Sequence, residues 1–252
     1  MRYLLSSVAE LPSNIIEQIN YFIQDGNSVN ITMALVDLLP NIIFMLGMAF
    51  IIKSAFGRIK PIYFALLSGG ALLAFLAGTI KAMWKVLCAV GYNCIPLTSS
   101  FGIYQFIGMT MIAIASLALT IADRRLLNKQ DSTVILSASA LPILIMGLAT
   151  VTAKLSAMWV ILLVLPTAVY QISFALMAWR RKMTWQGILF IVSLFLATIM
   201  GALKKKFEDP SSQLSQLNWL AQCVNIIAQV AMVIPAYLLC RTMPRIKVTY
   251  DK

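Results

Sequence analysis

The side chains of this sequence that could bind a ligand are mostly amides inside long apolar blocks. A side-chain amide donates and accepts hydrogen bonds, so it can contact either a neutral polar ligand or a neighbouring helix, and both interpretations stay open. Prolines in the same blocks each remove one backbone hydrogen bond from a helix. These features predict a ligand site built from Asp37, Pro40, Asn41, Gln105, Pro166, Gln171, Gln222, Asn225 and Gln229.

Asp37 is the one acidic residue that falls well inside an apolar block. A charge there is costly unless it is paired or hydrated, so one hypothesis is that the carboxylate contacts a coupling ion or a substrate. The alternative is that Asp37 stands near a helix start at the membrane interface. There the helix dipole would favour the negative charge and headgroups would hydrate it.

The residues needed for common catalytic mechanisms are missing. The sequence has no histidine, which removes the commonest metal ligand and the usual general base near neutral pH. Its nine acidic residues supply no carboxylate pair inside the apolar blocks, and its four cysteines lack zinc-ligand spacing. We therefore expect no enzyme activity, no metal and no cofactor.

The elements that carry these residues are membrane-spanning helices. The chain is 60% hydrophobic and only 12% charged, far from the balance of a soluble domain. Apolar blocks of about 20 residues cross a bilayer as helices, because every backbone amide must be paired within the chain. The sequence predicts an all-α seven-transmembrane helical bundle with spans at Met33 to Ile52, Ile62 to Ile80, Phe101 to Ala122, Val134 to Ala153, Met158 to Ala178, Met183 to Leu203 and Leu217 to Leu239.

Lysine and arginine predict how these spans are oriented, since basic residues are retained on the cytoplasmic side. Loops 53–61, 123–132 and 179–184, together with the carboxyl-terminal tail, hold 13 basic residues, whereas the other side holds seven. The amino terminus is therefore predicted to be extracytoplasmic and the carboxyl terminus cytoplasmic. The expected regions are an outer segment 1–32 with an amphipathic interfacial helix over Pro12 to Gln24, a transmembrane domain 33–240 and a basic tail 241–252.

Two further features belong to the predicted outer side. An outer basic rim could concentrate anions or bind headgroups, and it comprises Lys81, Lys85, Lys154 and Lys204. Cys88 and Cys94 could form a disulfide if that compartment is oxidising, while Cys223 is expected in the core. The net charge of +11 is better explained by anionic lipid headgroups than by nucleic acid, because the basic residues stand in short loops.

Matching segments suggest an internal repeat. Pro40 precedes Lys53 by 13 residues and Pro166 precedes Arg180 by 14 residues, and the following blocks end in similar Leu-Ala segments. The third and seventh blocks each carry an early glutamine, Gln105 and Gln222. These matches predict two parallel three-helix repeats joined by a linker helix, a 3+1+3 plan, although helix pairs are an alternative repeat unit.

Two family resemblances follow from these residues. The segment Asp123-Arg124-Arg125 and the segment Pro235-Ala236-Tyr237 resemble the DRY and NPxxY signatures of G-protein-coupled receptors, with Arg125 in place of tyrosine and Ile234 in place of asparagine. The 3+1+3 plan, with Pro40 and Pro166 in the first helix of each half, is similar to the architecture of the SWEET and PnuC transporter families. No family motif transfers substrates or binding residues to this chain.

The leading hypothesis is a small-solute transporter or facilitator with a central polar site between two helical triplets. One alternative is a seven-helix receptor or sensor that signals to a cytoplasmic protein partner through its inner loops. Another is a non-catalytic structural subunit of a membrane complex. The expected partners are the lipid bilayer, anionic headgroups and a small-molecule ligand, with no nucleic acid.

Overall fold

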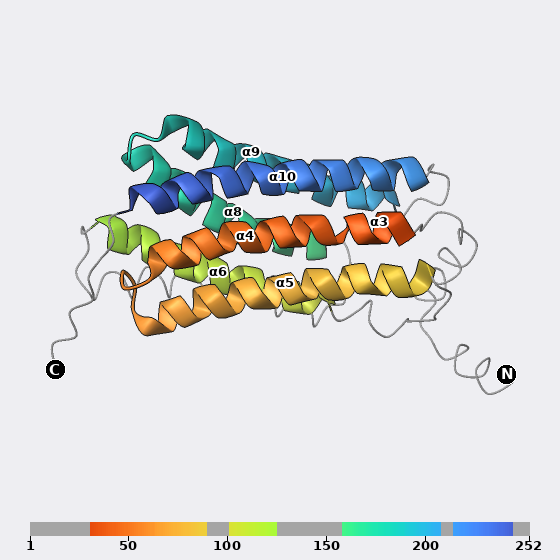
Figure 1. The fold of residues 1–252 in the computed structure, drawn as a ribbon, viewed down its shortest axis with the longest axis horizontal. Helices are drawn as coiled ribbons and strands as arrows, with labels where there is room; N and C mark the ends of the chain where they lie inside the picture. Colours follow the sequence, from red (N-terminus) through yellow and green to blue (C-terminus); the bar gives the residue numbers. More distant parts are fainter. Residues whose placement is uncertain (1–30, 90–100, 125–157, 208–213, 244–252) are drawn as a thin grey trace, which may run out of the picture.

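The computed structural model describes residues 31–89, 101–124, 158–207 and 214–243. The described residues form helices joined by short turns, and the long helices lie side by side along one axis (Figure 1). The elements are α3 (Ile31–Val36), α4 (Leu38–Ala55), α5 (Pro61–Ala89), α6 (Phe101–Arg124), α8 (Met158–Arg180), α9 (Thr184–Phe207) and α10 (Leu214–Thr242).

Four of the described helices have the length and composition of membrane spans. The segments that are long and apolar enough to cross a bilayer are Leu38–Ala55, Pro61–Met83, Gly102–Asp123 and Trp219–Thr242. Large apolar side chains such as Ile42, Phe195 and Ile227 are exposed on their outer surfaces, which suits a lipid environment. The prediction of an all-helical membrane protein is confirmed at this level, whereas the span predicted at Val134 to Ala153 lies outside the described residues.

Several helix ends differ from the predicted ones. The second span was expected to end at Ile80, but α5 continues to Ala89, so Lys81 and Lys85 lie within a helix and not in a loop. Likewise Lys204 lies within α9, which ends at Phe207. Lysine has a high helix propensity, and its long side chain can reach the interface while its backbone stays helical.

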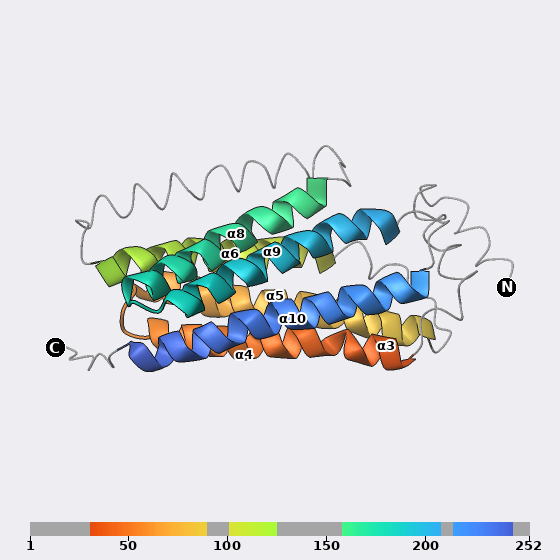
Figure 2. The ribbon, with the colours of Figure 1, turned by 90° about the horizontal axis from the view of Figure 1, so that it is seen from above.

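The six long helices are arranged as a ring. Helix α4 packs against α5 and α10, α5 against α6, α6 against α8, α8 against α9, and α9 against α10. Figure 2 shows that α4, α6, α8 and α10 run in one direction and α5 and α9 in the other. We call the end where α4, α6, α8 and α10 finish the Asp123 end, and the opposite end, where α3 begins, the Asp37 end.

The hydrophobic core occupies the half of the bundle next to the Asp123 end. Its largest fully buried members come from every long helix: Met48, Ile51, Leu67, Ile112, Leu119, Phe174, Met177, Phe190, Met232 and Leu239. The Phe174 ring lies 5.8 Å from the Tyr170 ring and 5.6 Å from the Phe190 ring, measured between centroids. Apolar packing therefore fills this half of the ring interior.

Helices α5 and α6 approach each other most closely at two glycines. A Cβ atom on Gly70 would stand 2.7 Å from the Gly108 carbonyl oxygen, and one on Gly108 would stand 2.7 Å from the Ala74 nitrogen. These neighbours are backbone atoms, which cannot rotate away. Small residues at helix crossings are the usual means of close packing in membranes.

Candidate functional site

The first predicted site residues lie where α3 and α4 meet. Pro40 has no N–H to donate to the Val36 carbonyl, and α3 ends at Val36. The Asp37 side chain at this break is buried, and its carboxylate accepts a hydrogen bond from Nε2 of Gln222 on α10. Protein therefore covers the Asp37 carboxylate, and Asp37 is the N-cap residue of α4, the helix start that the alternative prediction named.

Asn41 follows one turn later and lies between α4 and α5. Its Nδ2 donates to the Asp37 backbone carbonyl at 3.2 Å. A Cβ atom on Gly78 of α5 would overlap the Asn41 amide, so this glycine makes room for the side chain. The Asn41 amide thus stabilises the α3–α4 break and fills a space between two helices.

Gln171 is almost fully buried between α8 and α9. Its Nε2 donates to Ser193 Oγ at 3.1 Å and lies 3.5 Å from the Tyr170 hydroxyl. Its Oε1 atom is buried and has no hydrogen-bond partner among the described residues. Half of this amide is therefore an unused acceptor inside the bundle.

Three amides share one face of α10, because Gln222, Asn225 and Gln229 are three and four residues apart. Nε2 of Gln229 donates to Oδ1 of Asn225 at 3.5 Å. Within the described part of the chain, Oε1 of Gln222 and Oε1 of Gln229 are buried without a hydrogen-bond partner. Gln222 and Gln229 repeat the pattern of Gln171, in which the amide donates a hydrogen bond and its oxygen has no partner among the described residues.

The structure brings some predicted site residues together and leaves others apart. It joins Asp37 to Gln222 and Asn225 to Gln229, whereas Gln171 bonds within the α8–α9 pair. Pro166 is buried inside α8, which stays helical across it. Gln105 is half-buried on α6 and makes no side-chain hydrogen bond within the described residues.

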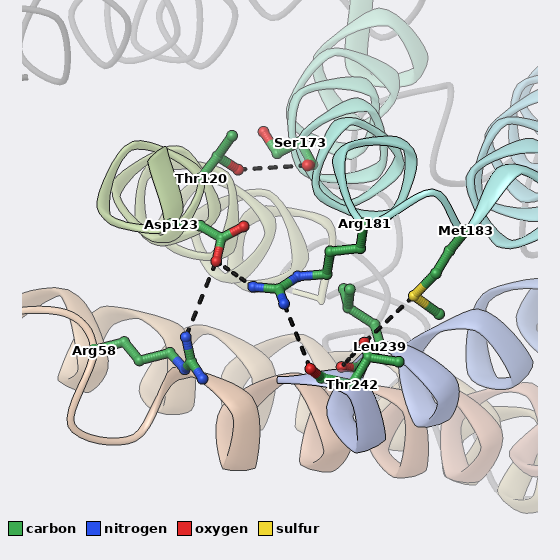
Figure 3. Close-up of polar contacts among 8 residues, drawn as sticks. All are labelled: Arg58, Thr120, Asp123, Ser173, Arg181, Met183, Leu239 and Thr242. Carbon is green, nitrogen blue, oxygen red and sulfur yellow. Dashed lines mark hydrogen bonds and ion pairs between the residues drawn. The ribbon is translucent and has the colours of Figure 1, made fainter. Parts of the chain in front are cut away.

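A second polar cluster, at the Asp123 end, was not anticipated as a contact (Figure 3). Asp123 at the end of α6 accepts a hydrogen bond from Arg181, which lies in the turn between α8 and α9. Arg58, in the connection between α4 and α5, approaches the same Asp123 oxygen at 4.0 Å. We call Arg58, Asp123 and Arg181 the charge cluster.

The charge cluster reaches α10 as well. The second terminal nitrogen of Arg181 donates to the Thr242 backbone carbonyl at 3.5 Å, and the Thr242 hydroxyl contacts the Met183 sulfur at 3.3 Å. Burial lowers the pKa of the Arg58 guanidinium, the nearby Arg181 charge lowers it further, and Asp123 raises it. The Asp123 carboxylate thus lies between the two arginine side chains.

The sequence did contain a signal for this cluster. Asp123 is an acidic residue at the end of a span, on the side predicted to hold the basic loops with Arg58 and Arg181. In the sequence analysis, Asp123 contributes to the receptor resemblance, and Arg58 and Arg181 are counted only as basic loop residues. Which arginine pairs with Asp123 depends on the order of helices around the ring.

The predicted basic rim and disulfide include residues that lie outside the described part of the chain. Lys81 is half-buried on α5, and Lys85, Lys204 and Cys88 belong to helices, whereas Lys154 and Cys94 lie outside the described residues. Neither the basic rim nor the disulfide is tested. Cys223 was expected in the core, but it is exposed on α10, so that prediction is wrong.

Comparison with known protein families, with curated proteins and with solved structures finds no match to this chain. The function must therefore be argued from the two polar regions. One is a set of buried amides with unused oxygens, and the other is a cluster of charges that joins several helix ends.

Proposed function

We propose that the protein is a small-solute transporter or facilitator, with a polar site between two helical triplets, α4–α6 and α8–α10. The observation that carries the proposal is the set of buried amide oxygens without a hydrogen-bond partner among the described residues, on Gln171, Gln222 and Gln229. An unpartnered buried acceptor is costly, and a ligand or ordered water that donates to it removes the cost.

The chemistry of these amides indicates the class of solute. Their nitrogen atoms donate to Ser193, Asp37 and Asn225, whereas their oxygen atoms have no hydrogen-bond partner among the described residues. A solute that bears several O–H or N–H donors would satisfy them. We therefore propose a small, neutral, donor-rich solute such as a polyol, a sugar or an amide.

The packing of the ring supports two related halves. Exchanging α4, α5 and α6 with α8, α9 and α10 turns each contact of the ring into another observed contact. Pro40 and Pro166 then lie at similar distances from the ends of α4 and α8, at Ala55 and Arg180, although the helix is interrupted only before Pro40. Since α6 finishes at the Asp123 end and α8 begins at the opposite end, we propose that Val134 to Ala153 is the linking seventh span.

The charges support an orientation with the Asp123 end in the cytoplasm. Basic residues at this end include Lys53, Arg58, Lys60, Arg180, Arg181, Lys182 and Arg241. Retention of basic loops in the cytoplasm places them beside anionic headgroups of the inner leaflet. A Lys60→Cys variant without other cysteines should react with an impermeant maleimide only after cells are permeabilised, and reaction in intact cells would reverse the orientation.

Solute permeability of proteoliposomes tests the transport function. The probes are glycerol, glucose, serine and urea, each used in an osmotic-shock experiment followed by light scattering. We expect at least one of them to enter proteoliposomes faster than empty liposomes. Gln171→Leu should abolish the difference, whereas Gln186→Leu, a half-buried glutamine near the start of α9, should preserve it.

Equal entry of all four probes into proteoliposomes and empty liposomes would count against this solute class. If a second protein also purified with the chain in fixed ratio, a structural subunit of a complex would become the better hypothesis. A receptor is the second candidate, since the charge cluster links several helix ends on the predicted cytoplasmic side. A ligand that alters the binding of a cytoplasmic partner without entering liposomes would favour it.

A further inference from the structure

We infer that the charge cluster of Arg58, Asp123 and Arg181 is a gate that holds the two helical triplets together at the Asp123 end. The inference rests on the proposed division into α4–α6 and α8–α10. The inference extends the proposed function by naming the residues that keep one side of the solute path closed. The argument starts from where the two triplets meet.

The triplets meet along two seams, one between α6 and α8 and one between α4 and α10. Asp123 belongs to α6 in the first triplet, and Arg181 follows α8 in the second triplet, so their ion pair crosses the first seam. Thr120 supports the same seam by donating to the Ser173 carbonyl at 3.4 Å (Figure 3). Separating α6 from α8 at this end requires breaking both contacts.

The charge cluster also extends to the ends of α4 and α10, the two helices of the second seam, through one contact within each triplet. Arg58 comes from the connection that follows α4, and Arg181 donates to the carbonyl of Thr242 near the end of α10. The Asp123 carboxylate and two guanidinium groups therefore connect the described ends of α4, α6, α8 and α10. The Asp123 side chain is only 10% exposed, so water screens these contacts less than it screens a surface ion pair.

The interior behind the charge cluster is closed in this structure. Met48, Phe174 and Leu239 are fully buried there and belong to the continuous apolar core. At the opposite end, a polar contact from Gln222 to Asp37 crosses the α4–α10 seam. The two ends thus carry different polar contacts across the seams, as alternating opening of a solute path requires.

Thiol accessibility tests the gate without a transported solute. Two single-cysteine reporters lie on α10 in a background without native cysteines: Ala236→Cys in the apolar core and Ala228→Cys toward the Asp37 end. Both alanines are almost fully buried. The thiolate forms only where water reaches it, so the rate of reaction with N-ethylmaleimide in membrane vesicles reports hydration of each position.

Asp123→Asn should raise the reaction rate at the Ala236→Cys reporter about tenfold, which corresponds to a shift of about 1.4 kcal/mol toward the open form. The rate at the Ala228→Cys reporter should stay constant or fall. Arg181→Gln should act like Asp123→Asn. Arg180→Gln, which removes an exposed neighbouring charge, should leave both rates unchanged.

A charge-reversed pair, Asp123→Arg with Arg181→Asp, should return the Ala236→Cys rate toward that of the parent protein. An unchanged rate at Ala236→Cys in Asp123→Asn would overturn the gate, and so would equal increases at both reporters, because these indicate general loosening. Such a failure would leave the liposome experiment unaffected. Conversely, a failure of solute entry with a positive thiol result would count against the solute class and not against the gate.

Discussion

The two halves of this bundle use the same helices for opposite kinds of interior. Toward the Asp123 end, apolar side chains from all six long helices form a continuous core. Toward the Asp37 end, the interior contains Asp37, Asn41 and the amides of α10, and two of these amides, Gln222 and Gln229, have acceptors without a partner among the described residues. Helix association in lipid depends on packing, so the apolar half should supply most of the stability and the polar half the specificity.

The largest effect on stability should come from the apolar half. Phe174→Ala removes a fully buried ring that contacts Tyr170 and Phe190. We expect a loss of about 3 kcal/mol, near the lower limit for buried phenylalanines, because lipid solvates the unfolded helix and returns no hydrophobic gain. Thermal unfolding in detergent measures it.

Phe195→Ala on α9 is the matched control, since that ring is 64% exposed on the outer surface. It should change the unfolding temperature little. Similar losses for both variants would show that the two halves do not differ in the way proposed, and that ring size alone determines the cost.

Gln229→Leu in the polar half should change stability less than Phe174→Ala does, but it should abolish function. The substitution removes an amide whose oxygen is unpartnered among the described residues and whose nitrogen makes a bond of 3.5 Å. Replacing such a group with an apolar one of similar shape should change stability by less than about 1 kcal/mol. Solute entry into proteoliposomes should nevertheless be lost.

The proposed difference between the two halves would be wrong if Gln229→Leu lowered the unfolding temperature as much as Phe174→Ala does. It would also be wrong if this variant transported normally, since the polar half would then have no special role. Parallel measurement of unfolding temperature and osmotic permeability separates these two outcomes.

The smallest effect should come from Ser193→Ala at the boundary between the halves. It removes the hydroxyl that accepts from Gln171 at 3.1 Å. Interhelical hydrogen bonds in membrane proteins contribute about 0.6 kcal/mol on average, so we expect a decrease of that size. Thr198→Ala is the control, because its exposed hydroxyl bonds only within α9, to Leu194; an equal change in both would remove any special role for the α8–α9 contact.

The membrane class could be predicted from the sequence, because apolar blocks long enough to span a bilayer can adopt few structures other than membrane helices. Helix ends such as Ala89 were missed because lysines continue a helix as readily as they end one. Contacts between helices were harder, since apolar residues surround each helix and mark no single face. The pairing of Asp37 with Gln222, and of Asp123 with Arg181, depends on the ring order, which the separate blocks do not encode.

The contact between Gly70 and Gly108 limits which motions the bundle can make. At this crossing main-chain atoms of α5 and α6 touch with no side chain between them, so a sliding movement would drive one backbone into the other. The α4–α10 seam is different, because Gly47 there faces the flexible end of Met232. We therefore expect α5 and α6 to move as one rigid piece, so that, in the proposed transporter, a passage would open along the seams between the triplets, beside Met232 or between α6 and α8.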